Sequence, residues 1–245
     1  MRHWSRSYLL LLCWSAIRLR HTLPLMVIIQ TMLAVGIVIG FSFLVPTMDQ
    51  QTALYLSTGA PTLGLITVGM VLAPQLVAEA KTAGTFDYNR TLPVPRSTIL
   101  AADLSIWLLS ALPGLVLALF TATLRFDITL DVSPLVVVAV LLVALTATAI
   151  GYAIAYATSP TVANLIAQLI VFVSLMFSPV NFPADRLPEW LRAVHQVLPF
   201  QYMAEAVRDT LAVPTDGIST APFAVLAGWC LLGLTVTMRI MTRRG

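Results

Sequence analysis

Five long stretches without a charged residue dominate this chain, and they restrict it to folds that are stable in a lipid bilayer. The stretches are 22–48, 50–78, 104–124, 132–183 and 217–238. A helix needs about 20 apolar residues to cross a hydrocarbon core of about 30 Å. The fourth stretch is more than twice that length, so it holds two crossings. The sequence therefore predicts an all-α membrane protein with six transmembrane helices.

The composition excludes several classes of protein. Charged residues make up 10% of the chain, whereas soluble domains carry about 25%. The single lysine is Lys81 and no phosphate-binding loop of the form G-x-x-x-x-G-K-[ST] occurs, so we expect ATP hydrolysis, if any, on another chain. Cys13 and Cys230 lie in apolar runs, which predicts neither a disulfide framework nor a metal site. We expect no cofactor on this chain.

Basic residues are divided unevenly between the two sides of the predicted membrane. With the N-terminus inside, cytoplasmic segments contain ten of the 14 basic residues, and external loops contain eight of the 11 acidic residues. Arginine and lysine on short loops stay in the cytoplasm, so both termini are predicted to be cytoplasmic. The net charge of +3 reflects this rule, and we expect no nucleic-acid partner, because that would require a dense basic patch.

Prolines, glycines and charged residues divide the chain into its elements. The six spans are expected at 24–45, 53–77, 104–124, 133–158, 162–177 and 221–238. Within the second span, Gly59, Gly64 and Gly69 are expected to let neighbouring helices approach closely.

Residues 1–21 begin with two arginines and an apolar run, as a secretory signal peptide does. The run, 7–17, is too short to cross a bilayer, and two further arginines follow where a small-residue cleavage site would be required. We predict instead a helix along the cytoplasmic interface, with Trp4, Tyr8 and Trp14 at headgroup depth.

Two polar segments between the spans differ from ordinary loops. The longest cytoplasmic connection, 79–103, combines charged residues with a glycine break and two proline stops. It is predicted to form a short helix on the membrane surface, and a solvated turn is the alternative. In the external segment 181–215, apolar residues recur at helical spacing opposite charged ones. We expect a pair of re-entrant helices in the outer leaflet, with a surface hairpin as the alternative.

These two segments resemble the signature regions of the permease subunit of type-2 ATP-binding-cassette exporters, and the resemblance covers nearly the whole chain. The matching residues are Glu79, Gly84, Thr85, Leu92, Pro93, Val94 and Arg96 in the cytoplasm, and Pro183, Leu187, Pro188, Trp190, Leu191, Pro199, Phe200, Ala206 and Arg208 outside. The family includes daunorubicin-resistance-type drug permeases, which this chain resembles, and polysaccharide exporters. One departure is Ser178-Pro179, where relatives often carry a glycine, and it concerns the shape of the outer gate.

The resemblance implies a machine with two permease and two ATPase subunits in the bacterial cytoplasmic membrane, with ATP and magnesium on the ATPase. The implied coupling helix, which seats on the ATPase, comprises Glu79, Lys81, Gly84, Thr85, Phe86, Asp87, Tyr88, Pro93 and Arg96. The implied external gate comprises Pro179, Pro183, Trp190, Pro199 and Arg208.

Polar and aromatic residues within the spans mark a candidate substrate path. They are Gln30, Phe41, Phe43, Asn164, Gln168, Phe172 and Met176. Asn164 and Gln168 are four residues apart and share one helix face. The alternative is that the polar members bind neighbouring helices, at about 1 kcal/mol or less each.

The absence of charge within the spans favours an amphipathic or lipid-soluble substrate, such as a drug, an antibiotic or a lipid-like compound. Export of a polysaccharide or lipid-linked glycan is the alternative. An ion-coupled secondary transporter fits less well, because such proteins carry ionisable residues near the bilayer midplane. A noncatalytic scaffold leaves the two polar segments unexplained.

Overall fold

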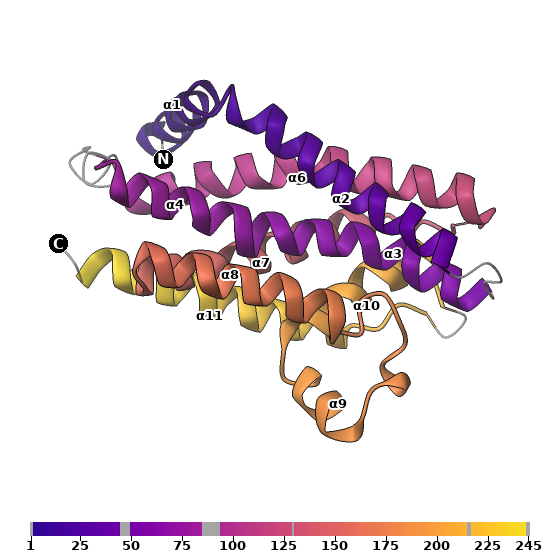
Figure 1. Ribbon diagram of the computed structural model, residues 1–245. Coiled ribbons are helices and arrows are strands. Elements are labelled where there is room, and N and C mark those ends of the chain that lie inside the picture. Colours follow the sequence, from indigo (N-terminus) through magenta and orange to yellow (C-terminus); the bar gives the residue numbers. More distant parts are fainter. Residues whose placement is uncertain (1, 45–49, 85–93, 129, 215–216, 244–245) are drawn as a thin grey trace.

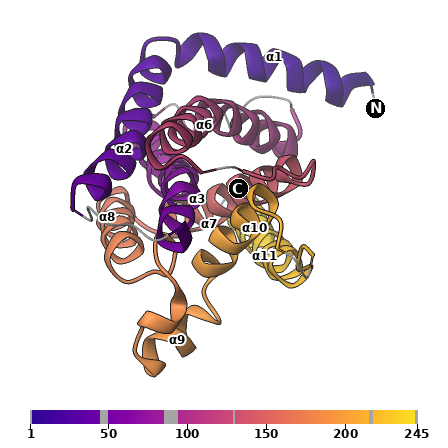
Figure 2. The ribbon, with the colours of Figure 1, turned by 90° about the vertical axis from the view of Figure 1, so that its right-hand side faces the viewer.

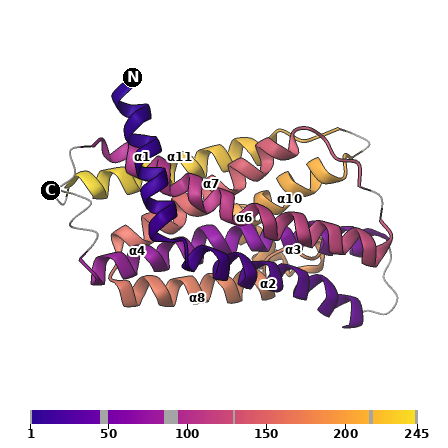
Figure 3. The ribbon, with the colours of Figure 1, turned by 90° about the horizontal axis from the view of Figure 1, so that it is seen from above.

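The structure, a computed structural model, describes residues 2–44, 50–84, 94–128, 130–214 and 217–243, and its regular elements in these ranges are helices. In chain order they are α1 (Arg2–Arg18), α2 (Thr22–Leu44), α3 (Gln50–Thr67), the π-helical turn η1 (Val68–Leu72), α4 (Ala73–Thr82), α6 (Arg96–Phe126), α7 (Val136–Ala157), α8 (Pro160–Met176), the 3₁₀ turn η2 (Ala184–Arg186), α9 (Glu189–His195), α10 (Pro199–Leu211) and α11 (Ala221–Arg243). The long helices form an elongated bundle (Figures 1 and 3).

Five helical stretches of the described residues are long and apolar enough to cross a membrane. They are Thr22–Phe43, Gln50–Thr82, Ser97–Phe126, Val136–Ala157 and Ala221–Ile240. The apolar α8 is shorter, at 17 residues, which is close to the lower limit of about 17–25 residues for a span. The prediction of an all-helical, multi-pass membrane protein is confirmed at this level.

One end of the bundle carries both chain termini (Figure 1). The end of α4, the start of α6 and the turn between α7 and α8 lie at the same end. There α1 runs across the bundle (Figure 2) and packs on α6, where the hydroxyl groups of Tyr8 and Ser105 are 2.7 Å apart. Away from α6, α1 exposes the apolar side chains of Leu10, Trp14 and Ile17.

A single continuous helix formed by α3, η1 and α4, here called the central helix, runs through the middle of the bundle. Most of its side chains are buried, against α2, α6, α7, α8 and α10. Pro74 has no N–H to donate to the carbonyl one turn earlier, which disfavours a regular α-helix at that point. The π turn at Val68–Leu72 ends two residues before this proline, so the change of helical pitch accompanies the missing hydrogen bond.

Glycines allow the central helix, α7 and α11 to touch through their backbones. A Cβ on Gly69 would meet Ala147 Cβ at 2.5 Å, one on Gly151 would overlap the carbonyl oxygen of Gly69 and Pro74, and one on Gly233 would meet the Ala149 backbone at 2.9 Å. The predicted role of Gly69 in close helix approach is confirmed. Gly59 approaches the backbone at Val180 instead, and Gly64 makes only ordinary contact with Gln30.

The helices extend beyond the predicted spans at the end that carries the termini. The second span was expected to end at residue 77 and the third to begin at residue 104, whereas the helices run to Thr82 and from Arg96. Hydropathy marks the part of a helix that lies in hydrocarbon, and the helix itself continues through polar residues such as Lys81 and Asp103. The other span boundaries differ from the helix ends by a few residues.

The glycine contacts generate a test of the packing. We expect Gly151→Ala to destabilise the protein by about 1–3 kcal/mol, because overpacking forces the central helix and α7 apart. Thermal unfolding of the purified chain in detergent measures this loss. The matched control is Gly228→Ala in α11, where a Cβ meets nothing within 4 Å. Equal unfolding temperatures for the two variants would contradict the packing described here.

Candidate functional site

Lys81, in the last turn of α4, fastens the central helix to the end of α7. Its Nζ donates to the carbonyl oxygens of Ala155 at 2.5 Å and Thr158 at 3.3 Å, and it lies 5.7 Å from the centroid of the Tyr156 ring. The last carbonyl groups of a helix lack intrahelical donors and carry partial negative charge, so they attract a cation. Lys81 therefore joins the start of the predicted coupling segment to the α7–α8 turn.

The helix that follows the coupling segment, α6, is also attached to its neighbours by polar contacts. Trp107 Nε1 donates to the Tyr152 hydroxyl of α7 at 2.8 Å, and both side chains are buried. Ser15 Oγ of α1 donates to the Asp103 carboxylate at 3.5 Å. Both helices that flank the coupling segment are thus bound to α7, and α6 is bound to α1 as well.

The other residues of the predicted coupling helix lie close to this junction or outside the described residues. Glu79 is exposed and, two residues before Lys81, points to a different side of α4. Gly84 has a φ of 73°, which glycine adopts without strain, and the chain leaves the helix there. Arg96 is the first residue of α6. Thr85, Phe86, Asp87, Tyr88 and Pro93 lie outside the described residues.

At the opposite end of the bundle, Arg208 of α10 is buried and joins three segments. Its Nε donates to Thr58 Oγ1 at 3.2 Å, and its Nη2 donates to the carbonyl oxygen of Val180 at 2.7 Å. The guanidinium carbon lies 3.8 Å from the centroid of the Tyr55 ring, which provides a cation–π contact. Arg208 therefore holds α10, the central helix and the loop after α8 together, and we call this arrangement the Arg208 junction.

The loop at the Arg208 junction is packed as tightly as a helix contact. A Cβ on Gly59 would overlap Asn181 Oδ1 and lie 2.5 Å from the carbonyl oxygen of Val180. Ser178, Pro179 and Val180 are buried. The hydrogen bond from Arg208 satisfies the Val180 carbonyl, which would otherwise be unpaired in this buried place.

The remaining predicted gate residues lie on different parts of the external segment. Pro199 is the buried first residue of α10, Pro183 is half-buried before η2, and Trp190 is exposed on α9. The structure therefore brings Pro179, Pro199 and Arg208 into the packed interior and leaves Trp190 at the surface.

The acidic neighbours of Arg208 lie on the same helix. Burial raises the pKa of Glu205, which accepts a hydrogen bond from Gln201 Nε2 at 2.7 Å. Burial also raises the pKa of Asp209, against the opposing effect of the Arg208 charge.

On α9, burial lowers the pKa of His195, so this imidazole is held in its neutral form at pH 7.

Gln30, a predicted substrate-path residue, is buried between three helices. It is 3% exposed, and its Nε2 donates to the carbonyl oxygen of Ala111 at 3.4 Å. A Cβ added to Gly114 would lie 3.3 Å from the Gln30 amide, and one added to Gly64 would lie 3.4 Å from its Nε2, so the amide packs against both glycines. This geometry favours the alternative role of a contact between helices.

The path residues on α8 form an exposed face. Asn164, Gln168, Phe172 and Met176 are all exposed. On α2, Phe43 is 75% exposed and Phe41 is half-buried. The two helices border the same side of the bundle (Figures 2 and 3).

Sequence reasoning missed the partners that give these residues their positions. Trp107 and Tyr152 were not singled out, nor were Tyr55 and Thr58. A weak signal exists for the last pair, because a tyrosine and a threonine three residues apart share one helix face. Their partner, 150 residues away in the sequence, has no such signal.

Comparison with known proteins adds one match. A family model described as ABC-2 type transporter matches residues 8–212, from α1 to the residue after α10. The matched region includes the Lys81 contacts and the Arg208 junction. No match was found among curated proteins.

The Lys81 contacts predict a local effect on α7. We expect Lys81→Met to speed amide hydrogen exchange near residues 154–160 by about fivefold, because a cation at a helix C-terminus contributes about 1 kcal/mol. Exchange detected by mass spectrometry measures it. Lys81→Arg keeps the cation and should retain most of the protection. Unchanged exchange in Lys81→Met would show that the contact contributes nothing.

We expect that removing the Arg208 side chain lowers the stability of the protein by more than removing the Lys81 cation does. Arg208→Met leaves the buried Val180 carbonyl without a donor, and we expect a loss of about 1–3 kcal/mol of stability in thermal unfolding. Arg208→Lys should restore only part of it, because an ammonium lacks the planar fork of donors. The control is Arg186→Met, at an exposed position of the same external segment, and it should behave as wild type. If Arg208→Met and Arg186→Met unfold at the same temperature, the junction is not a stabilising contact.

Proposed function

The chain belongs to the ABC-2 type transporter family, and on that premise we propose that it is the transmembrane subunit of an ATP-driven exporter of an amphipathic or lipid-soluble compound. Membership makes it a multi-pass transport permease that works with an ATPase. Export of a drug-like or lipid-like substrate, as in the daunorubicin-resistance-type permeases it resembles, is our proposal. The support is the lack of acidic or basic residues within the six expected spans, which suits a substrate that enters from the membrane.

The partner ATPase would bind ATP and magnesium and would contact the segment 79–96. The observation that carries this proposal is that two charged residues at the end of α4, Glu79 and Lys81, have different surroundings. Glu79 is exposed, so a partner can reach it, whereas Lys81 is bound to the end of α7. A push on the segment is thereby delivered to α7 through Lys81 and to α6, which is itself bound to α7 through Trp107.

The central helix offers a route from the coupling segment to the opposite side of the membrane. Lys81 lies near one of its ends and Thr58 near the other, about 35 Å apart at the rise of an α-helix. Thr58 is one of the partners of Arg208. In our proposal, displacement of α4 by the ATPase changes the Arg208 junction, and the external gate opens or closes as a result.

We further propose a topology with six spans and both termini in the cytoplasm of a bacterium. In it α8 is the fifth span and α11 the sixth, α1 lies in the cytoplasmic interface, and α9 and α10 form a re-entrant pair before α11. The exposed apolar face of α1 supports the interfacial position. The packing of α10 against α3, α7 and α11 supports its position inside the outer leaflet.

The exposed face of α8 is the proposed meeting place of substrate and a second permease subunit. Unsatisfied polar groups are costly in contact with lipid, yet Asn164 and Gln168 are exposed in the single chain. A second subunit, identical or paired, would cover this face and leave a path along Phe172 and Phe43. Glycan export remains the alternative, and the charge-free spans argue against ion-coupled transport.

Reconstitution with the ATPase tests the proposal. The purified chain alone should hydrolyse no ATP, and Glu79→Ala in the complex should lower transport and substrate-stimulated ATP hydrolysis together. The matched control is Glu189→Ala, the same substitution at an exposed position on α9, which should leave both near wild type. ATP hydrolysis by the isolated chain would refute the division of labour, and normal transport by Glu79→Ala would refute the coupling role.

A further inference from the structure

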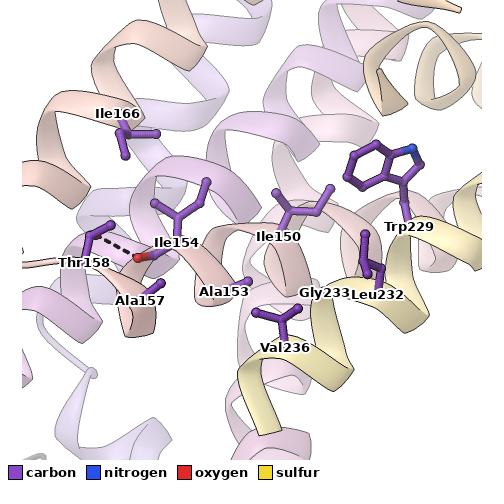
Figure 4. Close-up of a pocket in the computed structure, with 10 residues that line it drawn as sticks. All are labelled: Ile150, Ala153, Ile154, Ala157, Thr158, Ile166, Trp229, Leu232, Gly233 and Val236. Carbon is purple, nitrogen blue, oxygen red and sulfur yellow. Dashed lines mark hydrogen bonds between the residues drawn. The ribbon is translucent and has the colours of Figure 1, made fainter. Parts of the chain in front are cut away.

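An apolar groove of about 270 Å³ runs along α7 between α8 and α11 (Figure 4). The space arises where residues are small, at Ala153 and Ala157 of α7 and Gly233 of α11. Larger apolar side chains border it, among them Ile166 of α8 and Val236 of α11. None of these residues belongs to the coupling segment or to the Arg208 junction.

The groove exists because α8 and α11 pack on different partners. Gly233 brings α11 against the backbone of α7 at Ala149, whereas α8 makes most of its contacts with the central helix. Figures 2 and 3 place α7 between α8 and α11. The surface of α7 between Ile150 and Thr158 is therefore flanked by α8 on one side and α11 on the other.

The lining is suited to hydrocarbon. Its two polar groups are already engaged, because Thr158 Oγ1 donates to the carbonyl oxygen of Ile154 at 2.8 Å and Trp229 Nε1 donates to that of Val197 at 3.2 Å. A ligand finds no partner here for a polar group. The volume is nearly twice that of an engineered apolar cavity of about 150 Å³ that binds benzene, so it accommodates a segment of an alkyl chain.

Basic residues lie at the end of the groove nearest the chain termini. Arg239 is exposed and follows Val236 by three residues, so it continues the same face of α11. Lys81 is bound to the carbonyl oxygens of Ala155 and Thr158 at the end of α7. Glu79 precedes Lys81 by two residues, which places it on another side of α4. The charges at this mouth of the groove favour an anionic group.

A second copy of the chain suits the groove less well than a lipid does. The polar face of α8 with Asn164 and Gln168, which we assign to subunit contact, lies across the helix from Ile166, because residues two apart point about 200° away from each other. The groove thus opens on a different side of α8. Its lining residues on α7 and α11 belong to stretches long and apolar enough to cross the membrane.

We propose that this groove binds one acyl chain of an anionic phospholipid, taken from the leaflet on the side of the chain termini, with the lipid phosphate beside Arg239. The site does not depend on the identity of the transported compound or on ATP. Its occupation would fill the space between α8 and α11 and brace the α7–α8 turn on which Lys81 acts.

Photolabelling of the full chain in phosphatidylcholine vesicles tests the site. The probe is phosphatidylglycerol with a diazirine in one acyl chain, added as a minor component, and labelled peptides are mapped by mass spectrometry. Labelling should concentrate in residues 150–158 and 229–236. Ala153→Trp and Ala157→Phe, which fill the groove, should each reduce it to the level found elsewhere on the lipid-facing surface. The control Leu109→Trp, at an exposed position of α6 that does not line the groove, should leave it unchanged.

The headgroup is tested with the same diazirine chain on phosphatidylcholine. One basic residue near an anionic lipid contributes about a fivefold preference, so the phosphatidylcholine probe should label the groove about that much less, and Arg239→Gln should remove the difference. Even labelling over all exposed helices would overturn the proposal, as would disulfide formation between copies carrying Ala157→Cys in a Cys-free background. Equal labelling by both headgroups would overturn the anionic specificity.

Discussion

The close backbone contact between the central helix and α7 is the constraint on which the rest of the structure depends. Gly69 and Gly151 remove the side chains that would keep the two helices apart, and Pro74 packs into the space beside Gly151. In a bilayer there is little hydrophobic gain from bringing two apolar helices together, so close packing of this kind supplies much of the association energy. The position of α11 follows from the same device, through Gly233 on Ala149.

Polar contacts lie towards the two ends of the central helix, and they differ in the kind of partner that each cation binds. Lys81 binds backbone carbonyl groups at the end of α7. The last carbonyl groups of any helix lack intrahelical donors, so this partner does not depend on a particular side chain. Arg208 depends instead on three groups from two segments, one of them the carbonyl of Val180 in a loop. Both sets of contacts lie on one continuous helix, and this helix is the route of displacement in the mechanism that we propose.

The predictions that came from local patterns were the ones that held most closely. The uncharged stretches became long helices, and Gly69 makes the close approach expected of it. The role of Gln30 was left open by its sequence, because an amide in an apolar run suits substrate and neighbouring helix equally. Only its burial beside Gly114 and its bond to Ala111 favour the second role. The helix ends were misplaced because hydropathy reports the bilayer and not the last helical residue.

The sequence by itself determined that the chain is helical and enters the membrane, since backbone groups in hydrocarbon must be paired within a helix and about 20 apolar residues are needed to cross. It also determined which segments are polar enough to meet a partner outside the bilayer. The tertiary structure alone decided that Lys81 turns to α7 while Glu79 stays exposed, that Arg208 meets Tyr55 and Thr58, and that α8 and α11 leave a groove between them. These contacts depend on how helices far apart in the chain cross one another. The crossing is set by how small and large side chains on two helix surfaces fit together. The residue pattern along one helix alone does not contain that information.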